Sequence, residues 1–95
     1  MTTHFYRPKE FAQVVQQLEE AGLTIEEAKY FNRAFGSWDI EVSNAVGDRG
    51  LLIWDGRDRW IILQTQDDQG TWVDDRIVRD PQDDTIQQII DRLNS

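Results

Sequence analysis

The sequence predicts a single α+β domain over residues 1–95: a four-stranded antiparallel meander with two N-terminal helices and one C-terminal helix, in the order ααββββα. Three observations predict this fold class. Apolar residues recur at helical spacing near both ends of the chain, strand-like alternation and short apolar runs fill the middle, and Gly or Pro separates these segments. A chain of 95 residues is long enough for one core and too short for two.

The first helix is predicted from Pro8 to Ala21, because four apolar residues there fall at i, i+3, i+4 and i+7. They are Phe11, Val14, Val15 and Leu18. Gly22 should end this helix, since glycine fits the left-handed position just past a helix end. Thr24 and Glu27 have the spacing of a capping box, which predicts a second helix over residues 24–36.

The period changes to two after Ser37, where Trp38, Ile40 and Val42 alternate with polar residues and predict a half-buried strand. Apolar runs at 51–54 and 60–63 flank Asp55-Gly56-Arg57-Asp58, and this pattern predicts a hairpin.

A fourth strand is predicted over residues 71–78. Its Asp74-Asp75 pair interrupts the alternation and indicates a bulge or an edge strand. After Pro81, Thr85 and Gln88 repeat the capping-box spacing and predict the last helix. Its apolar stripe is Ile86, Ile89, Ile90 and Leu93.

Both faces of the predicted hairpin are apolar, since an even-length turn divides its residues into two apolar sets. One set is Leu51, Ile53, Trp60 and Ile62, and the other is Leu52, Trp54, Ile61 and Leu63. Two interpretations follow. Either the chain shields both faces itself, by curling the sheet or by placing the last helix opposite the first two, or the first set forms a homodimer face or a ligand surface.

Ten basic and eighteen acidic side chains give the chain a net charge of −8, and residues 37–95 hold thirteen of the acids against six bases. This field repels phosphate backbones and anionic lipids, so no nucleic-acid partner and no membrane partner is predicted. No membrane-length apolar run and no signal-peptide pattern occurs, which predicts a cytoplasmic protein.

The acidic residues have two interpretations, a solvated surface that aids solubility or a docking surface for a basic protein. The predicted partner-binding residues are six acids and two aromatic anchors. They are Asp67, Asp68, Asp74, Asp75, Asp83, Asp84, Trp60 and Trp72.

The sequence offers little for catalysis. It has no Cys, His4 is its only histidine, and it contains no phosphate-binding glycine motif, so neither an enzyme nor a cofactor or metal site is predicted. Asp39 and Glu41 have the separation of a glycosidase pair, but they are better explained as the polar face of an edge strand.

The predicted function is therefore that of a small acidic, non-enzymatic protein-binding module, such as a bacterial-type inhibitor or immunity-type protein that masks a basic partner. Two alternatives stay open. One is a homodimeric structural or regulatory domain, and the other is a small-molecule binder that uses tryptophans on the sheet. The four tryptophans are Trp38, Trp54, Trp60 and Trp72, each on a different predicted strand.

Overall fold

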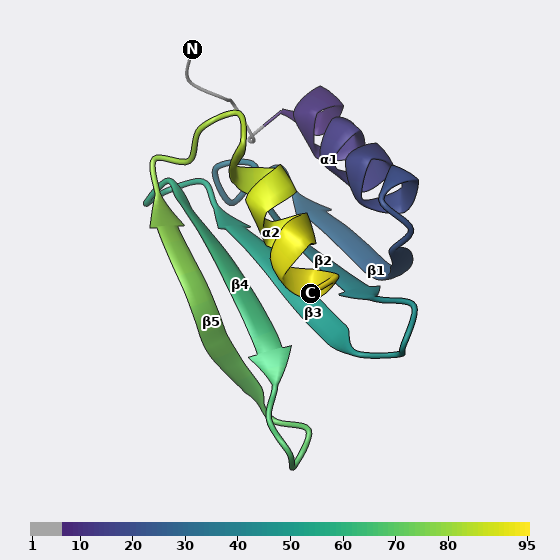
Figure 1. Ribbon diagram of the computed structural model, residues 1–95. Coiled ribbons are helices and arrows are strands. Elements are labelled where there is room, and N and C mark those ends of the chain that lie inside the picture. Colours follow the sequence, from purple (N-terminus) through teal and green to yellow (C-terminus); the bar gives the residue numbers. More distant parts are fainter. Residues whose placement is uncertain (1–6) are drawn as a thin grey trace.

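The computed structural model describes residues 7–95 and contains one antiparallel sheet of five strands with two helices on one of its faces (Figure 1). In chain order the elements are α1 (Pro8–Glu20), β1 (Thr24–Phe31), β2 (Ser37–Ser43), β3 (Arg49–Asp55), β4 (Trp60–Gln66), β5 (Trp72–Arg79) and α2 (Thr85–Leu93). The strands lie in chain order, so β1 and β5 are the two edges. The α+β class and the antiparallel meander are confirmed, whereas the prediction of four strands and three helices is corrected to five strands and two helices.

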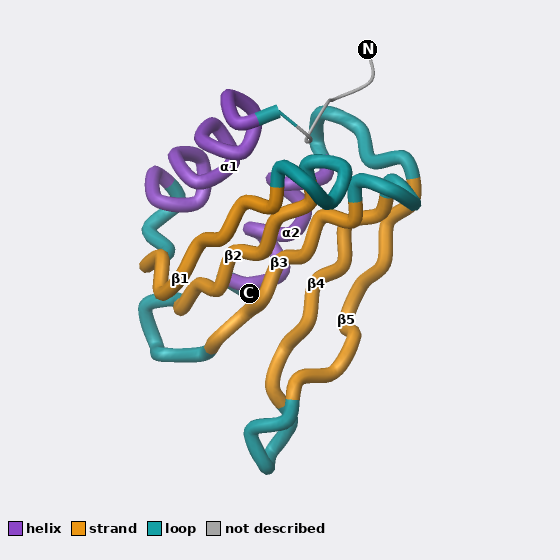
Figure 2. The backbone as a smooth tube through the Cα atoms, turned by 180° about the vertical axis from the view of Figure 1, so that it is seen from behind, coloured by secondary structure: helices purple, strands orange, loops and turns teal. Residues whose placement is uncertain are grey.

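The core lies between the sheet and the helices, which cover the same sheet face. Val14 and Leu18 of α1 join the apolar stripe of α2 in one buried cluster with the inward side chains of β2, β3 and β4. Trp38 and Trp54, which are cross-strand partners, are 0% and 1% exposed at its centre. From behind, the strands face the viewer and α2 lies beyond them (Figure 2).

The end of α1 follows the prediction. Gly22 has a φ of +86°, and its N–H donates to the Glu19 carbonyl while the N–H of Leu23 donates to the Leu18 carbonyl. These two bonds form a Schellman motif, in which the left-handed glycine reverses the chain and the following apolar side chain packs back on the helix. Leu23 is accordingly buried.

The predicted second helix is wrong, because residues 24–31 form the edge strand β1. Ile25 and Tyr30 both pack against the core, although residues five apart point to opposite faces of a regular strand. A bulge between Ile25 and Glu27 adds one residue and brings both side chains to the helix side. The bulge hides the strand period, and the Thr24–Glu27 spacing then resembles a helix cap by coincidence.

The β3–β4 hairpin is confirmed with the predicted faces. Asp55 pairs with Trp60 across a four-residue turn, and Asp55 Oδ1 accepts the backbone N–H groups of Arg57 and Asp58 at 3.0 and 3.1 Å. The set on the helix side is at most 1% exposed, whereas the opposite set is only partly buried. The members of these sets are Leu52, Trp54, Ile61 and Leu63 on the helix side, and Leu51, Ile53, Trp60 and Ile62 on the other.

The predicted irregularity in the last strand is both a bulge and an edge. Leu63 pairs with Arg76 but Gln64 pairs with Asp74, so Asp75 is the extra residue of β5.

The predicted cap at Thr85 is corrected. Thr85 is the first helical residue, and its buried hydroxyl accepts the N–H of Gln82.

Neither of the helices formed by residues 7–95 combines the length and the apolar character that crossing a membrane requires.

Candidate functional site

The sheet face that carries no helix, here called the open face, has an apolar half and an acidic half. Its apolar half is a group of five side chains, here called the apolar ribbon: Leu51, Ile53, Trp60, Ile62 and Ile77. Ile53, Ile62 and Ile77 are direct cross-strand partners in one row. Ile77 is 50% exposed and the other four are partly buried, so the ribbon is in contact with solvent. The structure thus brings together on one surface the four residues predicted as a dimer face.

Trp60 lies at one end of the ribbon beneath a cation. The Arg79 guanidinium carbon is 4.5 Å from the centroid of the indole ring, and the two residues are cross-strand partners. This cation–π contact holds the ring against the sheet and leaves its outer edge accessible.

The acidic half consists of Glu27, Asp39 and Glu41, here called the acidic band. Lys29 Nζ lies 3.3 Å from Glu27, and Arg49 donates to Glu41 at 2.7 Å, so two cations partly neutralise three carboxylates. A shallow cavity of about 190 Å³ lies where the band meets the ribbon. The expected polar face is present, but its expected position on an edge strand is wrong, because β1 flanks β2.

The acidity of Asp39 is perturbed by its surroundings. Burial raises the pKa of its carboxyl above the ordinary value of 3.8, Lys29 lowers the pKa, and Glu27 raises it again. The desolvation cost outweighs the attraction of the one facing cation. Asp39 is therefore a carboxylate that an additional positive charge would stabilise.

The six predicted acidic contact residues do not form one surface. Asp67, Asp68 and Asp74 lie at or near the β4–β5 turn, whereas Asp83 and Asp84 precede α2 at the other end of β5. The eight residues of β5 lie between Asp68 and Asp83, a span of about 25 Å, and Asp74 lies on β5 itself with five strand residues after it.

Several of these acids have local structural roles. Asp75 lies 3.1 Å from Arg92 of α2, on the helix side of the sheet. Asp67 Oδ1 accepts the N–H groups of Gln69 and Thr71 inside its own turn, and Asp84 accepts from the Gln88 side chain. These contacts stabilise the fold locally.

The four tryptophans do lie on four different strands. Trp38 and Trp54 are core residues, so their rings are not exposed on the sheet as a stacking platform. Trp60 and Trp72 are partly buried and lie at opposite ends of β4, because Trp72 pairs with Gln66; the separation is about 20 Å. The two predicted aromatic anchors therefore belong to different ends of the molecule.

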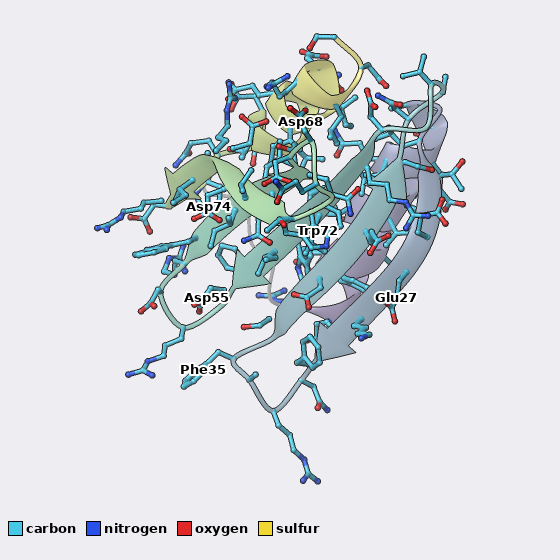
Figure 3. The ribbon with its side chains drawn as sticks, turned by 90° about the horizontal axis from the view of Figure 1, so that it is seen from below. Glu27, Phe35, Asp55, Asp68, Trp72 and Asp74 are labelled. Carbon is cyan, nitrogen blue, oxygen red and sulfur yellow. The ribbon has the colours of Figure 1, made fainter. Side chains whose placement is uncertain are left out.

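A groove that the sequence analysis does not find lies at one end of the open face, here called the turn groove. It has a volume of about 470 Å³ between the β1–β2 turn and the β3–β4 turn. Its lining consists of Arg33, Ala34, Phe35, Ser37, Asp39, Ile53, Trp54, Asp55 and Arg57. Figure 3 shows Phe35 and Asp55 near each other, on the side of the sheet away from α2.

The two turns are held together at a close approach. The Gly56 N–H donates to Ser37 Oγ at 2.9 Å, and a Cβ at Gly56 would overlap the carbonyl oxygen of Phe35. Phe35 itself has a φ of +58° and is 67% exposed. The signal for this groove is topological, since alternate turns of a meander meet at the same end of the sheet, and it appears only once β1 is identified as a strand.

Other chemistry is sparse on the described surface. Within residues 7–95 no group of three acidic or histidine side chains is placed to hold a metal ion. His4, the only histidine, lies outside the described residues.

Comparisons of this chain with protein-family models, with curated proteins and with solved structures find no match.

Proposed function

We propose that this protein is a non-enzymatic binding module that holds a basic protein partner against the open face of its sheet. The observation that carries the proposal is the contrast between the two sheet faces. The four apolar side chains of the β3–β4 hairpin on the helix side are 1% exposed or less, whereas the apolar ribbon on the other side stays in contact with solvent. Contiguous apolar side chains rimmed by polar groups are typical of interaction surfaces.

The charge of the molecule favours a basic partner. The chain carries a net charge of −8, and the acidic band lies beside the apolar ribbon on the same face. An apolar contact beside acidic residues suits a partner with an apolar centre and a cationic rim, and the overall field accelerates encounter with such a partner. An inhibitor or immunity-type protein that masks a basic enzyme needs this combination.

A second copy of the chain fits the open face less well. In a two-fold face-to-face pair, the acidic band would lie against itself or against the apolar side chains of the opposite half. The first arrangement opposes like charges, and the second desolvates carboxylates without new partners.

Pairing through the sheet edges is also opposed by local features. Both edge strands contain a bulge, and charged side chains such as Glu27 and Lys29 on β1 and Asp74 on β5 flank the free backbone groups. Bulges and edge charges are devices that prevent strand addition. The expected state of the isolated protein is a monomer.

The size of the face limits the contact. Five strands about 4.8 Å apart and about 23 Å long give roughly 550 Å². A standard interface uses about 800 Å² on each side. A stable partner must therefore also contact the turns at the end of the sheet.

Charge substitutions on the two faces of β5 test the proposal. Ile77→Asp places a carboxylate in the apolar ribbon, and Val73→Asp places one on the same strand facing the other way; the parent side chains are 50% and 41% exposed. Each variant is immobilised and exposed to an extract of cells that produce the protein naturally. We expect a basic protein to be retained by the wild type and Val73→Asp, and to be lost with Ile77→Asp. Equal retention by all three proteins would contradict the proposal.

Mass measurement addresses the alternative of a homodimer. Sedimentation equilibrium at micromolar concentration should give the monomer mass of 11.2 kDa. A concentration-independent dimer that Ile77→Asp dissociates would instead assign the open face to a second copy.

A further inference from the structure

We propose that the turn groove is the anchor site for one long cationic side chain, arginine or lysine, of the bound protein. The inference rests on the proposed function and specifies which part of the partner that function would recognise. It extends the contact from the sheet face to the turns, where the limited area of the face requires additional contacts.

The groove is large enough for such a side chain and is continuous with the open face. Its volume of about 470 Å³ is within the range of sites that enclose small ligands. Ile53 belongs both to the groove and to the apolar ribbon, and Asp39 belongs both to the groove and to the acidic band. A partner seated on the face therefore has direct access to the groove.

The groove combines an apolar wall with fixed carboxylates. Phe35 and Ile53 offer surface to an aliphatic stem, and Asp39 and Asp55 offer acceptors to a cationic head. Arginine and lysine are the side chains that combine a long apolar stem with a charged head. The exposed ring of Phe35 adds the option of a cation–π contact.

The groove also contains two arginines, and their position decides whether a cationic or an anionic ligand fits it. Arg33 and Arg57 belong to the exposed turns, where water solvates their guanidinium groups. Asp39 and Asp55 extend from strands and are partly buried, and burial raises the pKa of Asp39. The partly buried charges of the groove are thus negative, and a cation would offset the desolvation of Asp39.

The groove is also preformed. Asp55 Oδ1 is fixed by two turn N–H groups, while the Gly56–Ser37 hydrogen bond ties the two turns together. Both turn hydrogen bonds are accepted by Oδ1, so Asp55 Oδ2 is left as an acceptor for a ligand. A preformed site reduces the ordering cost of binding.

Small-molecule titrations of the ¹⁵N-labelled full chain, followed by NMR, test this site without the partner. The probes are the N-acetyl, N-methylamide derivatives of arginine, lysine, citrulline and glutamate. Citrulline has the shape of arginine without its charge. We expect saturable shifts at the amides of Phe35, Ser37, Ile53 and Gly56 with the arginine or lysine derivative, and about two- to fivefold weaker binding of the citrulline derivative.

Two matched variants locate the charge. Asp39→Asn should weaken binding of the cationic derivatives about two- to fivefold, whereas Asp68→Asn, which removes the same charge at the other end of the sheet, should leave binding unchanged. Equal binding of arginine and citrulline derivatives would overturn the proposal. Preferred binding of the glutamate derivative would also overturn it and would assign the groove to an anion held by the two arginines.

The test of the turn groove and the test of the open face can fail independently. If Ile77→Asp abolishes capture of a basic protein while no cationic derivative shifts the groove amides, the anchor is overturned and the open-face function stands. If Ile77→Asp leaves capture intact, the open-face function fails, and with it the assignment of the groove as its anchor.

Discussion

Asp39 faces Ile53 on one side and Lys29 on the other. Burial makes its ionised form less favourable in the fold than in the unfolded chain, and the attraction of Lys29 offsets only part of this cost. Because the folded-state pKa is raised above the unfolded value, the folded protein binds the proton more tightly than the unfolded chain does. Ionised Asp39 therefore reduces stability above the folded-state pKa. That penalty disappears as the pH falls through the folded-state pKa to 3.8 and below.

Replacing Asp39 with asparagine removes this ionisation. We expect Asp39→Asn to be more stable than the wild type at pH 7, by less than about 1 kcal/mol because water screens the partly exposed side chain. The difference should vanish near pH 3. Urea unfolding at both pH values measures it, with Asp68→Asn as the control for a simple loss of charge. A loss of stability at pH 7 would mean that the attraction of Lys29 outweighs burial.

Gly56 allows the two turns that form the groove to meet. A methyl group at this position would overlap the Phe35 carbonyl oxygen, which belongs to backbone and cannot rotate away. We expect Gly56→Ala to cost about 1–3 kcal/mol and to shift the Phe35 and Ser37 amide resonances.

Gly47→Ala is the comparison for Gly56→Ala. Its added methyl meets no atom within 4 Å but must adopt a φ of +90°, so it should cost about 1 kcal/mol and leave the groove resonances unchanged. Equal costs with unchanged groove resonances in both variants would show that the turns do not depend on this close approach.

At the scale of the element, β1 can be distinguished from the helix that the sequence suggests by two neighbouring aromatic residues. Tyr30 packs against the core, with its ring centroid 5.5 Å from that of Phe11, whereas Phe31 is 41% exposed on the open face. In a helix over residues 24–36, Phe31 would belong to the buried stripe.

We therefore expect two truncations to reduce stability by different amounts. Tyr30→Ala should cost about 2–3 kcal/mol, less than a fully buried aromatic, and Phe31→Ala should cost under about 0.5 kcal/mol. Chemical denaturation of the two variants measures both values. A larger loss for Phe31→Ala than for Tyr30→Ala would contradict the strand.

Elements with an uninterrupted local pattern are predicted well. The apolar stripe of α2, the Gly22 end of α1 and the Asp55-Gly56 hairpin each depend on a few neighbouring residues, and the structure confirms all three. The bulge in β1 adds a single residue, and that residue is enough to replace a period of two with an irregular pattern. Thr24 then satisfies the rule for a helix cap without forming one.

The candidate site is predicted less well, because its parts are joined by tertiary structure. The apolar ribbon follows from alternation within one hairpin, and its four predicted members do share a face. The acidic set does not gather because β5 lies between Asp68 and Asp83, and the fourteen intervening positions in the sequence do not reveal this distance. The turn groove depends on contact between residues 35 and 56, which no local pattern encodes.

At the scale of the whole molecule, charge opposes the self-association that an exposed apolar face invites. The acidic band occupies the positions that would otherwise continue the ribbon across the sheet, since Asp39 pairs with Ile53 and Glu41 pairs with Leu51. Carboxylates at these positions would have to be desolvated or opposed in a symmetric pair. This arrangement is consistent with a face that stays free until a partner of opposite charge arrives.

Removing the two members of the acidic band that lie on β2 should therefore create a dimer. In Asp39→Val/Glu41→Val, valine suits a strand and extends the apolar surface from β3, β4 and β5 onto β2. We expect self-association at about 10–100 µM, since the contact is small and purely apolar. Sedimentation velocity measures it. Glu19→Val/Glu20→Val makes the same change of charge and hydropathy on the exposed side of α1 and should stay monomeric. If the β2 variant also stays monomeric, the acidic band is not what keeps the open face from binding a second copy, and the charge argument for a basic partner loses its support.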